Sequence, residues 1–298
     1  MPVRLIRFEE GSSSRLAILD PTGTKAMPVS ALGEGLEAAD WLEFIRRAAP
    51  EQMKPLEAFA KSGRGPSEGL LLEQLQLLAP VERPIHDILC VGVNYRAHYQ
   101  ECAAAIHMEE PEVAVYFSKR CSRMTGPEES VESHAGLDQA LDYEVELAVI
   151  LGKGGRDIAP QDVEDHIFGY SVFNDISART LQHSHVQWYR GKSLDGFCAM
   201  GPWIVTRDEL PMPLHLNVES RLNGEVRQHS NTRAFIRDIP KLISELSRGM
   251  TLEAGDIIIS GTPAGVGMGF DPPRYMKPGD VIECEVEGIG VLRNRIRE

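Results

Sequence analysis

The sequence predicts an α+β fold, in which a small N-terminal α+β module precedes a larger unit built on a mixed, curled β-sheet with a few helices. The composition is that of a globular protein, because 42% of the 298 residues are hydrophobic and 25% are charged. From residue 70 onward, short runs alternate apolar and polar residues between Gly, Pro and Asn, which is typical of strands. Helical patterns are fewer, so a regular alternation of parallel strands and helices is not expected.

Residues 1–78 have the pattern of a separate small domain. Its expected elements are strands at 3–10 and 14–20, a helical stretch at 40–60, and a linker rich in Gly, Pro and Ser at 62–69. We therefore predict two domains, 1–78 and 79–298.

The second domain contains most of the expected strands. These lie at 87–95, 113–119, 143–151, 171–175, 214–226, 255–261 and 280–296. Helices are expected at about 95–107, 160–166, 178–187 and 238–249.

The net charge of −13, from 31 basic and 44 acidic residues, argues against nucleic acid and anionic membrane surfaces as partners. No apolar run reaches the roughly 18–20 residues of a membrane helix, and the N-terminus meets charge too early for a secretory signal. A cytoplasmic location is therefore expected. An anionic substrate would need locally concentrated positive charge, which a bound metal ion provides compactly.

The cysteines suggest reduced thiols rather than a disulfide framework or a thiolate zinc site. Their number is odd and no pair has CxxC spacing. They are Cys90, Cys102, Cys121, Cys198 and Cys284.

Three carboxylates form a candidate metal site. Glu144 and Glu146 alternate along one strand and so project to the same side, and Asp175 ends the apolar strand 168–175. Such a pair can also lie on a solvated sheet face, but the strand continues into an apolar run, and buried carboxylates normally hold a cation. Carboxylates without His or Cys favour Mg²⁺ or Mn²⁺.

Two histidines offer an alternative zinc site. His183 and His185 stand two residues apart in an expected helix, which splays their side chains. We interpret both as surface histidines.

His98 and Glu101 form a candidate acid–base pair. They are three residues apart in an expected helix and therefore share a face. A carboxylate beside an imidazole fixes its tautomer and raises its basicity, as required to activate water near neutral pH. An exposed helix ion pair is the alternative interpretation.

Two glycine-containing motifs point to other enzyme classes but lack the required context. Gly65–Gly69 matches GxSxG, yet a nucleophile elbow needs a preceding strand and a following helix, and this motif lies in a linker. The segment 260–269 is glycine-rich but lacks a GK[ST] ending and GxGxxG spacing, and prolines follow it.

Taken together, five segments resemble the fumarylacetoacetate hydrolase family over residues 84–298. They are VGVNYRAH (91–98) followed by Glu101, DYEVEL (142–147), FNDISARTLQ (173–182), RGKSLDGF (190–197) and SGTPAGVG (260–267). The resemblance is to the bacterial hydratase, isomerase and acylpyruvate hydrolase branch. It implies a mixed β-roll or barrel with flanking helices, usually a homodimer.

The resemblance also implies roles for nine residues. The metal, Mg²⁺ or Mn²⁺, would chelate the carboxylate and 2-oxo group of a pyruvate-like substrate. A dyad would move a proton or activate water, and a lysine would stabilise enolate charge. The implied metal ligands are Glu144, Glu146 and Asp175, the catalytic residues His98, Glu101 and Lys192, and the substrate contacts Arg179, Gln182 and Thr262.

The implied reaction is hydrolysis of a carbon–carbon bond in a 3-acylpyruvate, of the fumarylpyruvate or fumarylacetoacetate type. Isomerisation or hydration of a 2-hydroxydienedioate and decarboxylation of oxaloacetate are alternatives, and a non-catalytic, metal-stabilised scaffold is a further one. Val91 stands where eukaryotic members carry an extra Asp, which disfavours their substrate. We expect residues 102–113 to form a lid that determines specificity.

Overall fold

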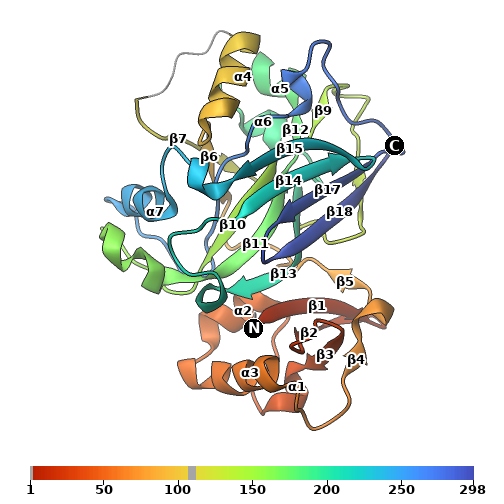
Figure 1. The fold of residues 1–298 in the computed structure, drawn as a ribbon, viewed down its shortest axis with the longest axis vertical. Helices are drawn as coiled ribbons and strands as arrows, with labels where there is room; N and C mark the ends of the chain where they lie inside the picture. The colour runs from red at the N-terminus through yellow and green to blue at the C-terminus, as the bar shows by residue number, and fades with distance from the viewer. Residues whose placement is uncertain (1–2, 107–111) are drawn as a thin grey trace.

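The computed structural model describes residues 3–106 and 112–298, and it confirms the predicted α+β class. Two large β-sheets pack together and helices lie at their edges (Figure 1). Residues 107–111, which belong to the predicted lid, are outside the described residues.

The larger sheet has the strand order β4-β3-β2-β1-β13-β11-β10-β16-β6-β7, with β5 paired to β1. The β16–β6 pair is parallel and the other pairs are antiparallel, so the sheet is mixed as expected. Its strands are β1 (Arg4–Glu10), β2 (Ser13–Leu19), β3 (Lys25–Pro28), β4 (Leu70–Leu71), β5 (Leu77–Leu78), β6 (Ile88–Gly92), β7 (Val115–Lys119), β10 (Val145–Leu151), β11 (Ile167–Asp175), β13 (Cys198–Thr206) and β16 (Ile257–Ile259).

The second sheet has the order β15-β14-β17-β18-β8, and a short β9–β12 pair stands apart. Asn223 and Gly224 both have positive φ, as a two-residue turn between β14 and β15 requires. The strands are β8 (Ser130–Glu132), β9 (Leu141–Asp142), β12 (Ser177–Ala178), β14 (Asn217–Leu222), β15 (Glu225–Asn231), β17 (Val281–Val286) and β18 (Gly290–Arg297).

Strand β10 is buried on both faces, which explains its continuous apolar sequence. Val145, Leu147 and Val149 enter the core between the two sheets, which they share with Ile282 of β17. The alternate residues, such as Ala148, enter a second core that includes residues of the N-terminal helices. A charged residue on this strand therefore lies inside the protein.

The N-terminal strands continue the larger sheet, because β1 pairs with β13. Figure 1 shows this part at the bottom of the molecule, with helices α1 (Val29–Leu32), α2 (Trp41–Arg47) and α3 (Pro50–Ser62). The helical stretch expected at 40–60 is thus two helices, because Pro50 begins α3 and holds Ala49 in an extended conformation. The domain division into 1–78 and 79–298 stays a prediction.

The remaining helices lie near the expected positions, with two corrections. The helix expected at 178–187 ends at Ser184, where His185 turns extended and its ring bonds the Leu181 carbonyl; a separate helix then carries Lys192. The segment 160–166 is a 3₁₀-helix. The α-helices are α4 (Arg96–Ile106), α5 (Arg179–Ser184), α6 (Tyr189–Lys192) and α7 (Ile239–Ser247), and the 3₁₀-helices are η1 (Leu72–Gln74), η2 (Pro160–His166), η3 (Arg207–Glu209), η4 (Thr232–Ala234) and η5 (Gly267–Gly269).

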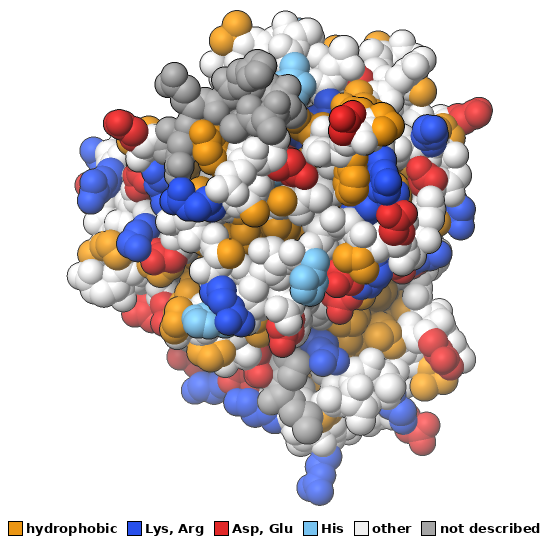
Figure 2. Space-filling view, turned by 45° about the horizontal axis from the view of Figure 1, so that its top comes forward, with side chains coloured by type: hydrophobic (Ala, Val, Ile, Leu, Met, Phe, Trp, Pro, Cys, Tyr) orange, Lys and Arg blue, Asp and Glu red, His pale blue; other side chains and the backbone are white. Residues whose placement is uncertain are grey.

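Among the residues that the structure describes, no helix is both long and apolar enough to cross a membrane. On the face drawn in Figure 2, acidic and basic side chains are interspersed.

Candidate active site

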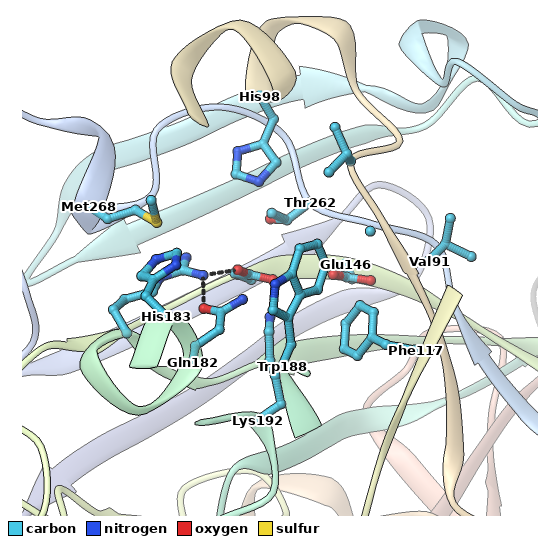
Figure 3. A pocket seen from close by; sticks show the side chains of 14 residues that line it. Val91, His98, Phe117, Glu146, Gln182, His183, Trp188, Lys192, Thr262 and Met268 are labelled. Atoms are coloured by element: carbon cyan, nitrogen blue, oxygen red, sulfur yellow. Dashed lines mark hydrogen bonds and ion pairs between the residues drawn. The ribbon is translucent and has the colours of Figure 1, made fainter. Parts of the chain in front are cut away.

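A small cavity of about 40 Å³ lies beneath α4, and most of the predicted site residues line it (Figure 3). Its walls come from β6, β7, β10, α4, α5, α6 and the loop after β16. The lining residues are Val91, Gly92, Val93, His98, Phe117, Glu144, Glu146, Arg179, Gln182, His183, Trp188, Lys192, Thr262 and Met268.

The three predicted metal ligands are clustered, and two of them, Glu144 and Glu146, line the cavity. One carboxylate oxygen each from Glu144, Glu146 and Asp175 lie within 4.8 Å of one another, and all three residues are buried. The antiparallel pairing of β10 and β11 brings them together, because the end of β11 lies opposite the start of β10. The Asp175 N–H donates to the Glu144 carbonyl at 2.9 Å, which fixes this register.

Lys192 bridges two of these carboxylates from α6. Its Nζ donates to Glu144 Oε2 at 2.7 Å and to Asp175 Oδ2 at 2.6 Å. Burial would lower the pKa of Lys192, but Asp175 and Glu144 outweigh it and raise the pKa above its usual value. Burial likewise opposes ionisation of Glu144, yet Lys192 and Arg179 hold its pKa well below the usual range. Both groups are therefore charged near neutral pH.

Glu146 is in a different electrostatic situation. Its carboxylate accepts a hydrogen bond from the Gly261 N–H at 2.6 Å. Burial, followed by the like charges of Asp175 and Glu144, raises the pKa of Glu146 well above its usual value. The cavity floor thus has a carboxylate that is costly to ionise unless another cation joins it.

The buried charges of this region leave negative charge in excess. The buried carboxylates of this region outnumber the buried Lys and Arg side chains, namely Asp138, Asp142, Glu144, Glu146 and Asp175 against Lys119, Arg179 and Lys192. An all-oxygen donor set with uncompensated charge is what a hard divalent cation requires. The residues present therefore fit Mg²⁺ or Mn²⁺.

Arg179 presents an unused hydrogen-bond donor. Its Nε donates to Asp142 Oδ2 at 2.9 Å, and its Nη1 reaches Gln182 Oε1 at 2.9 Å and Glu144 Oε1 at 2.7 Å. The Nη2 atom is buried and has no hydrogen-bond partner among the described residues, and Arg179 as a whole is only 4% exposed. A buried guanidinium with a free donor beside a cavity is suited to receive an anion.

The two residues of the predicted dyad are in contact on α4. His98 Nδ1 lies 3.1 Å from Glu101 Oε2, and Figure 3 shows the imidazole entering the cavity opposite Glu146. If Nδ1 donates its proton to Glu101, Nε2 is the basic nitrogen. The second Glu101 oxygen accepts from the Gly265 N–H at 3.0 Å, so the dyad is held by the loop as well as by the helix.

The glycine-rich loop 260–269 connects the parts of the site rather than binding a nucleotide. Besides its bonds to Glu146 and Glu101, it donates the N–H groups of Gly267 and Met268 to Asp142. Glycine is required at 265, because φ is +105° and a Cβ there would lie 2.0 Å from a backbone oxygen.

Thr262, predicted as a substrate contact, already uses its hydroxyl within the protein. The hydroxyl donates to the Val145 carbonyl at 2.9 Å and accepts from Gln228 Nε2 at 2.7 Å. Its substrate role stays a prediction, and in this arrangement the hydroxyl is limited to accepting a further hydrogen bond.

All nine predicted residues therefore lie in one region around the cavity. This region also contains charged residues that the sequence analysis did not predict. Asp142 has the same strand parity as Glu144 and Glu146, so alternation was a signal that could have found it. Lys119 is the last residue of a strand, and no sequence pattern indicated that it belongs to the site. His183 is exposed, as predicted, but it also lines the cavity, whereas His185 does not.

Comparisons with known proteins identify the family of this chain. Residues 87–297 match the family described as fumarylacetoacetate (FAA) hydrolase C-terminal. The chain is 46% identical over 225 residues to the oxaloacetate tautomerase YisK of Bacillus subtilis, covering 76% of this chain and 74% of that protein.

Two solved structures extend the likeness to the whole chain. The fumarylacetoacetate hydrolase of psychrophilic Exiguobacterium antarcticum is 41% identical, with a TM-score of 0.83 and 99% of each chain covered. The maleylpyruvate hydrolase of Sphingobium sp. SYK-6, in complex with manganese(II) and pyruvate, is 31% identical, with a TM-score of 0.77, and covers 99% of this chain and 98% of that one. This protein is therefore a member of the fumarylacetoacetate hydrolase family.

Proposed function

We propose that this protein is a divalent-metal-dependent enzyme that interconverts the keto and enol forms of a short 2-oxo acid, with oxaloacetate as the leading substrate. The observation that carries the proposal is the arrangement around the cavity, where three clustered carboxylates lie opposite the His98–Glu101 pair. The 46% identity to an oxaloacetate tautomerase supports this choice of substrate. We therefore rank tautomerisation ahead of the carbon–carbon hydrolysis that the sequence suggested first.

A divalent cation held by Glu144, Glu146 and Asp175 would act as a Lewis acid toward the 2-oxo group. Mg²⁺ and Mn²⁺ both suit these ligands. A bound divalent cation would offset the surplus of buried negative charge, and together with Arg179 and Lys192 it would present positive charge to an anionic substrate.

The protein's own residues would divide the proton transfer and the binding between them. His98 Nε2 would take a proton from C3 of the keto acid, and the imidazolium, stabilised by Glu101, would then give a proton to the 2-oxo oxygen, so that the enol forms and the imidazole is regenerated. The Lys192 ammonium would stabilise negative charge that develops on the 2-oxo oxygen. Arg179 Nη2 would receive a carboxylate of the substrate.

Hydrolysis of a 3-acylpyruvate is the second candidate. The same His98–Glu101 pair could activate a water molecule, and the likeness to a fumarylacetoacetate hydrolase covers 99% of both chains. Hydrolysis requires that water reach the distal carbonyl, whereas tautomerisation requires only proton transfer between C3 and the 2-oxo oxygen.

One assay separates the two candidates. We would follow the ultraviolet absorbance of enol-oxaloacetate with Mn²⁺, and measure pyruvate release from acylpyruvates under the same conditions. The proposal predicts accelerated loss of the enol signal over the uncatalysed rate, abolished by chelator and restored by Mn²⁺. Release of pyruvate from acylpyruvates with no acceleration of enol decay would select hydrolysis instead. Turnover that persists after complete chelation would contradict metal dependence.

Arg179→Lys tests the carboxylate contact. Lysine keeps the charge but loses the planar donors, so we expect KM to rise about tenfold or more, as for loss of a charged hydrogen bond worth about 1.5–3 kcal/mol. We expect kcat to change less than KM. Because Arg179 also contacts Glu144, Mn²⁺ affinity should be measured alongside. An unchanged KM would exclude this contact.

A further inference from the structure

Lys119 is a buried lysine that none of the roles above uses. It is the last residue of β7, where it lies opposite Ile88 of β6, and its side chain is 0% exposed. Its Nζ lies 5.9 Å from the centre of the Phe173 ring and 6.0 Å from that of Phe197. Burying an ammonium group among aromatic rings is costly unless strong partners compensate it.

The compensating partners are Asp175 and the residue that follows it. Lys119 Nζ donates to Asp175 Oδ1 at 2.5 Å and to the Ile176 carbonyl at 2.9 Å. Lys192 occupies the other Asp175 oxygen, Oδ2, at 2.6 Å. The two lysines therefore bond opposite oxygens of one carboxylate, and Lys119 also bonds the backbone that carries it.

We propose that Lys119 is a positioning residue that fixes the rotation of the Asp175 carboxylate so that it joins Glu144 and Glu146 in binding the divalent cation. This inference rests on the proposed metal site. A carboxylate has a rotatable side chain, and a bond from Lys119 to one oxygen sets where the other lies. The bond to Ile176 anchors the ammonium, so the lysine and the end of β11 cannot shift independently.

Removing Lys119 would have two opposite effects on metal affinity, so the direction of the measured change tests the proposed role. As a positive charge beside a cation site, Lys119 repels the metal, so by Coulomb's law alone its removal would strengthen binding. As an orienting partner, its removal would weaken binding, and loss of such partners typically costs about 10- to 100-fold in metal affinity. We expect the second effect to dominate.

The experiment measures Mn²⁺ affinity of the full chain, by electron paramagnetic resonance of free Mn²⁺, without any substrate. We expect Lys119→Met to bind Mn²⁺ roughly 10- to 100-fold more weakly than wild type. Lys119→Gln, whose amide can still donate a hydrogen bond, should fall between the two. Lys153→Met, which removes an exposed lysine away from the site, is the control and should bind as wild type does.

A second measurement guards against a variant that fails to fold. Circular dichroism and thermal unfolding in chelator identify such a variant. If Lys119→Met is unfolded, the Mn²⁺ affinity of Lys119→Gln tests the inference instead. The orienting effect must also act through Asp175, so in an Asp175→Asn background the loss caused by Lys119→Met should shrink toward zero.

Three results would overturn the inference. Folded Lys119→Met that binds Mn²⁺ as tightly as wild type, or more tightly, would remove the positioning role while leaving the proposed function intact. An undiminished loss in the Asp175→Asn background would show that Lys119 acts by another route. A wild-type chain that binds no Mn²⁺ would overturn both the positioning role and the proposed metal site.

Discussion

Replacing His98 with Ala is expected to lower kcat by roughly 10²- to 10⁴-fold, the usual contribution of a positioned general base. The imidazole is the group that the structure places in the cavity opposite the carboxylates, with Glu101 3.1 Å from its Nδ1. Mn²⁺ affinity should stay nearly unchanged, because the three candidate ligands lie on other elements. Steady-state kinetics and Mn²⁺ titration of the same preparation separate these effects.

Two further variants complete this test. Glu101→Gln keeps the shape of the side chain but removes the charge that stabilises an imidazolium, so we expect a smaller loss than for His98→Ala. His185→Ala changes an exposed histidine outside the cavity and should turn over normally. Wild-type turnover by His98→Ala would remove the dyad from the mechanism.

Glu146→Gln is expected to abolish catalysis and at the same time stabilise the metal-free protein. Because its folded-state pKa is raised, the ionised carboxylate costs stability at neutral pH, and that cost disappears as pH falls and Glu146 is protonated. A neutral amide removes this cost and still offers an oxygen to the Gly261 N–H. The amide is a poor ligand for a hard cation, so Mn²⁺ should bind at least roughly 100-fold more weakly. This loss exceeds the one expected when a residue that only hydrogen-bonds a metal ligand is removed.

Thermal unfolding with and without Mn²⁺ measures both effects of Glu146→Gln. In chelator its midpoint should exceed that of wild type, and added Mn²⁺ should raise it less than it raises the wild-type midpoint. Glu73→Gln, an exposed change in η1, should alter neither value. An equal Mn²⁺-induced shift in Glu146→Gln and wild type would exclude Glu146 as a ligand.

Much of the fold was predictable because its patterns are local. Alternation in β17, the apolar run of β10 and the helix α4 all follow from short stretches of sequence. The C-terminal end of α5 and the break between α2 and α3 were predicted wrongly, because the first depends on a side chain that bonds a backbone carbonyl and the second on one proline. The pairing of β1 with β13 joins segments about 200 residues apart, and no local pattern encodes it.

For the site, the sequence by itself determined the chemical types of its residues. Alternation placed Glu144 beside Glu146, and helical spacing placed His98 beside Glu101, since these relations act over a few residues. The resemblance to a family supplied the roles of Lys192 and Arg179, which no local pattern indicated.

Only the tertiary structure decided which charged groups, distant in the sequence, lie close enough to interact. The approach of Asp175 to Glu144 depends on the register of β10 with β11, and the contact of Lys119 with Asp175 depends on the separate packing of β7. The Arg179 Nη2, which has no partner within residues 3–106 and 112–298, and the raised pKa of Glu146 both arise from burial beside specific neighbours. Such electrostatic properties depend on distance and burial in three dimensions, which a linear pattern of residue types does not contain.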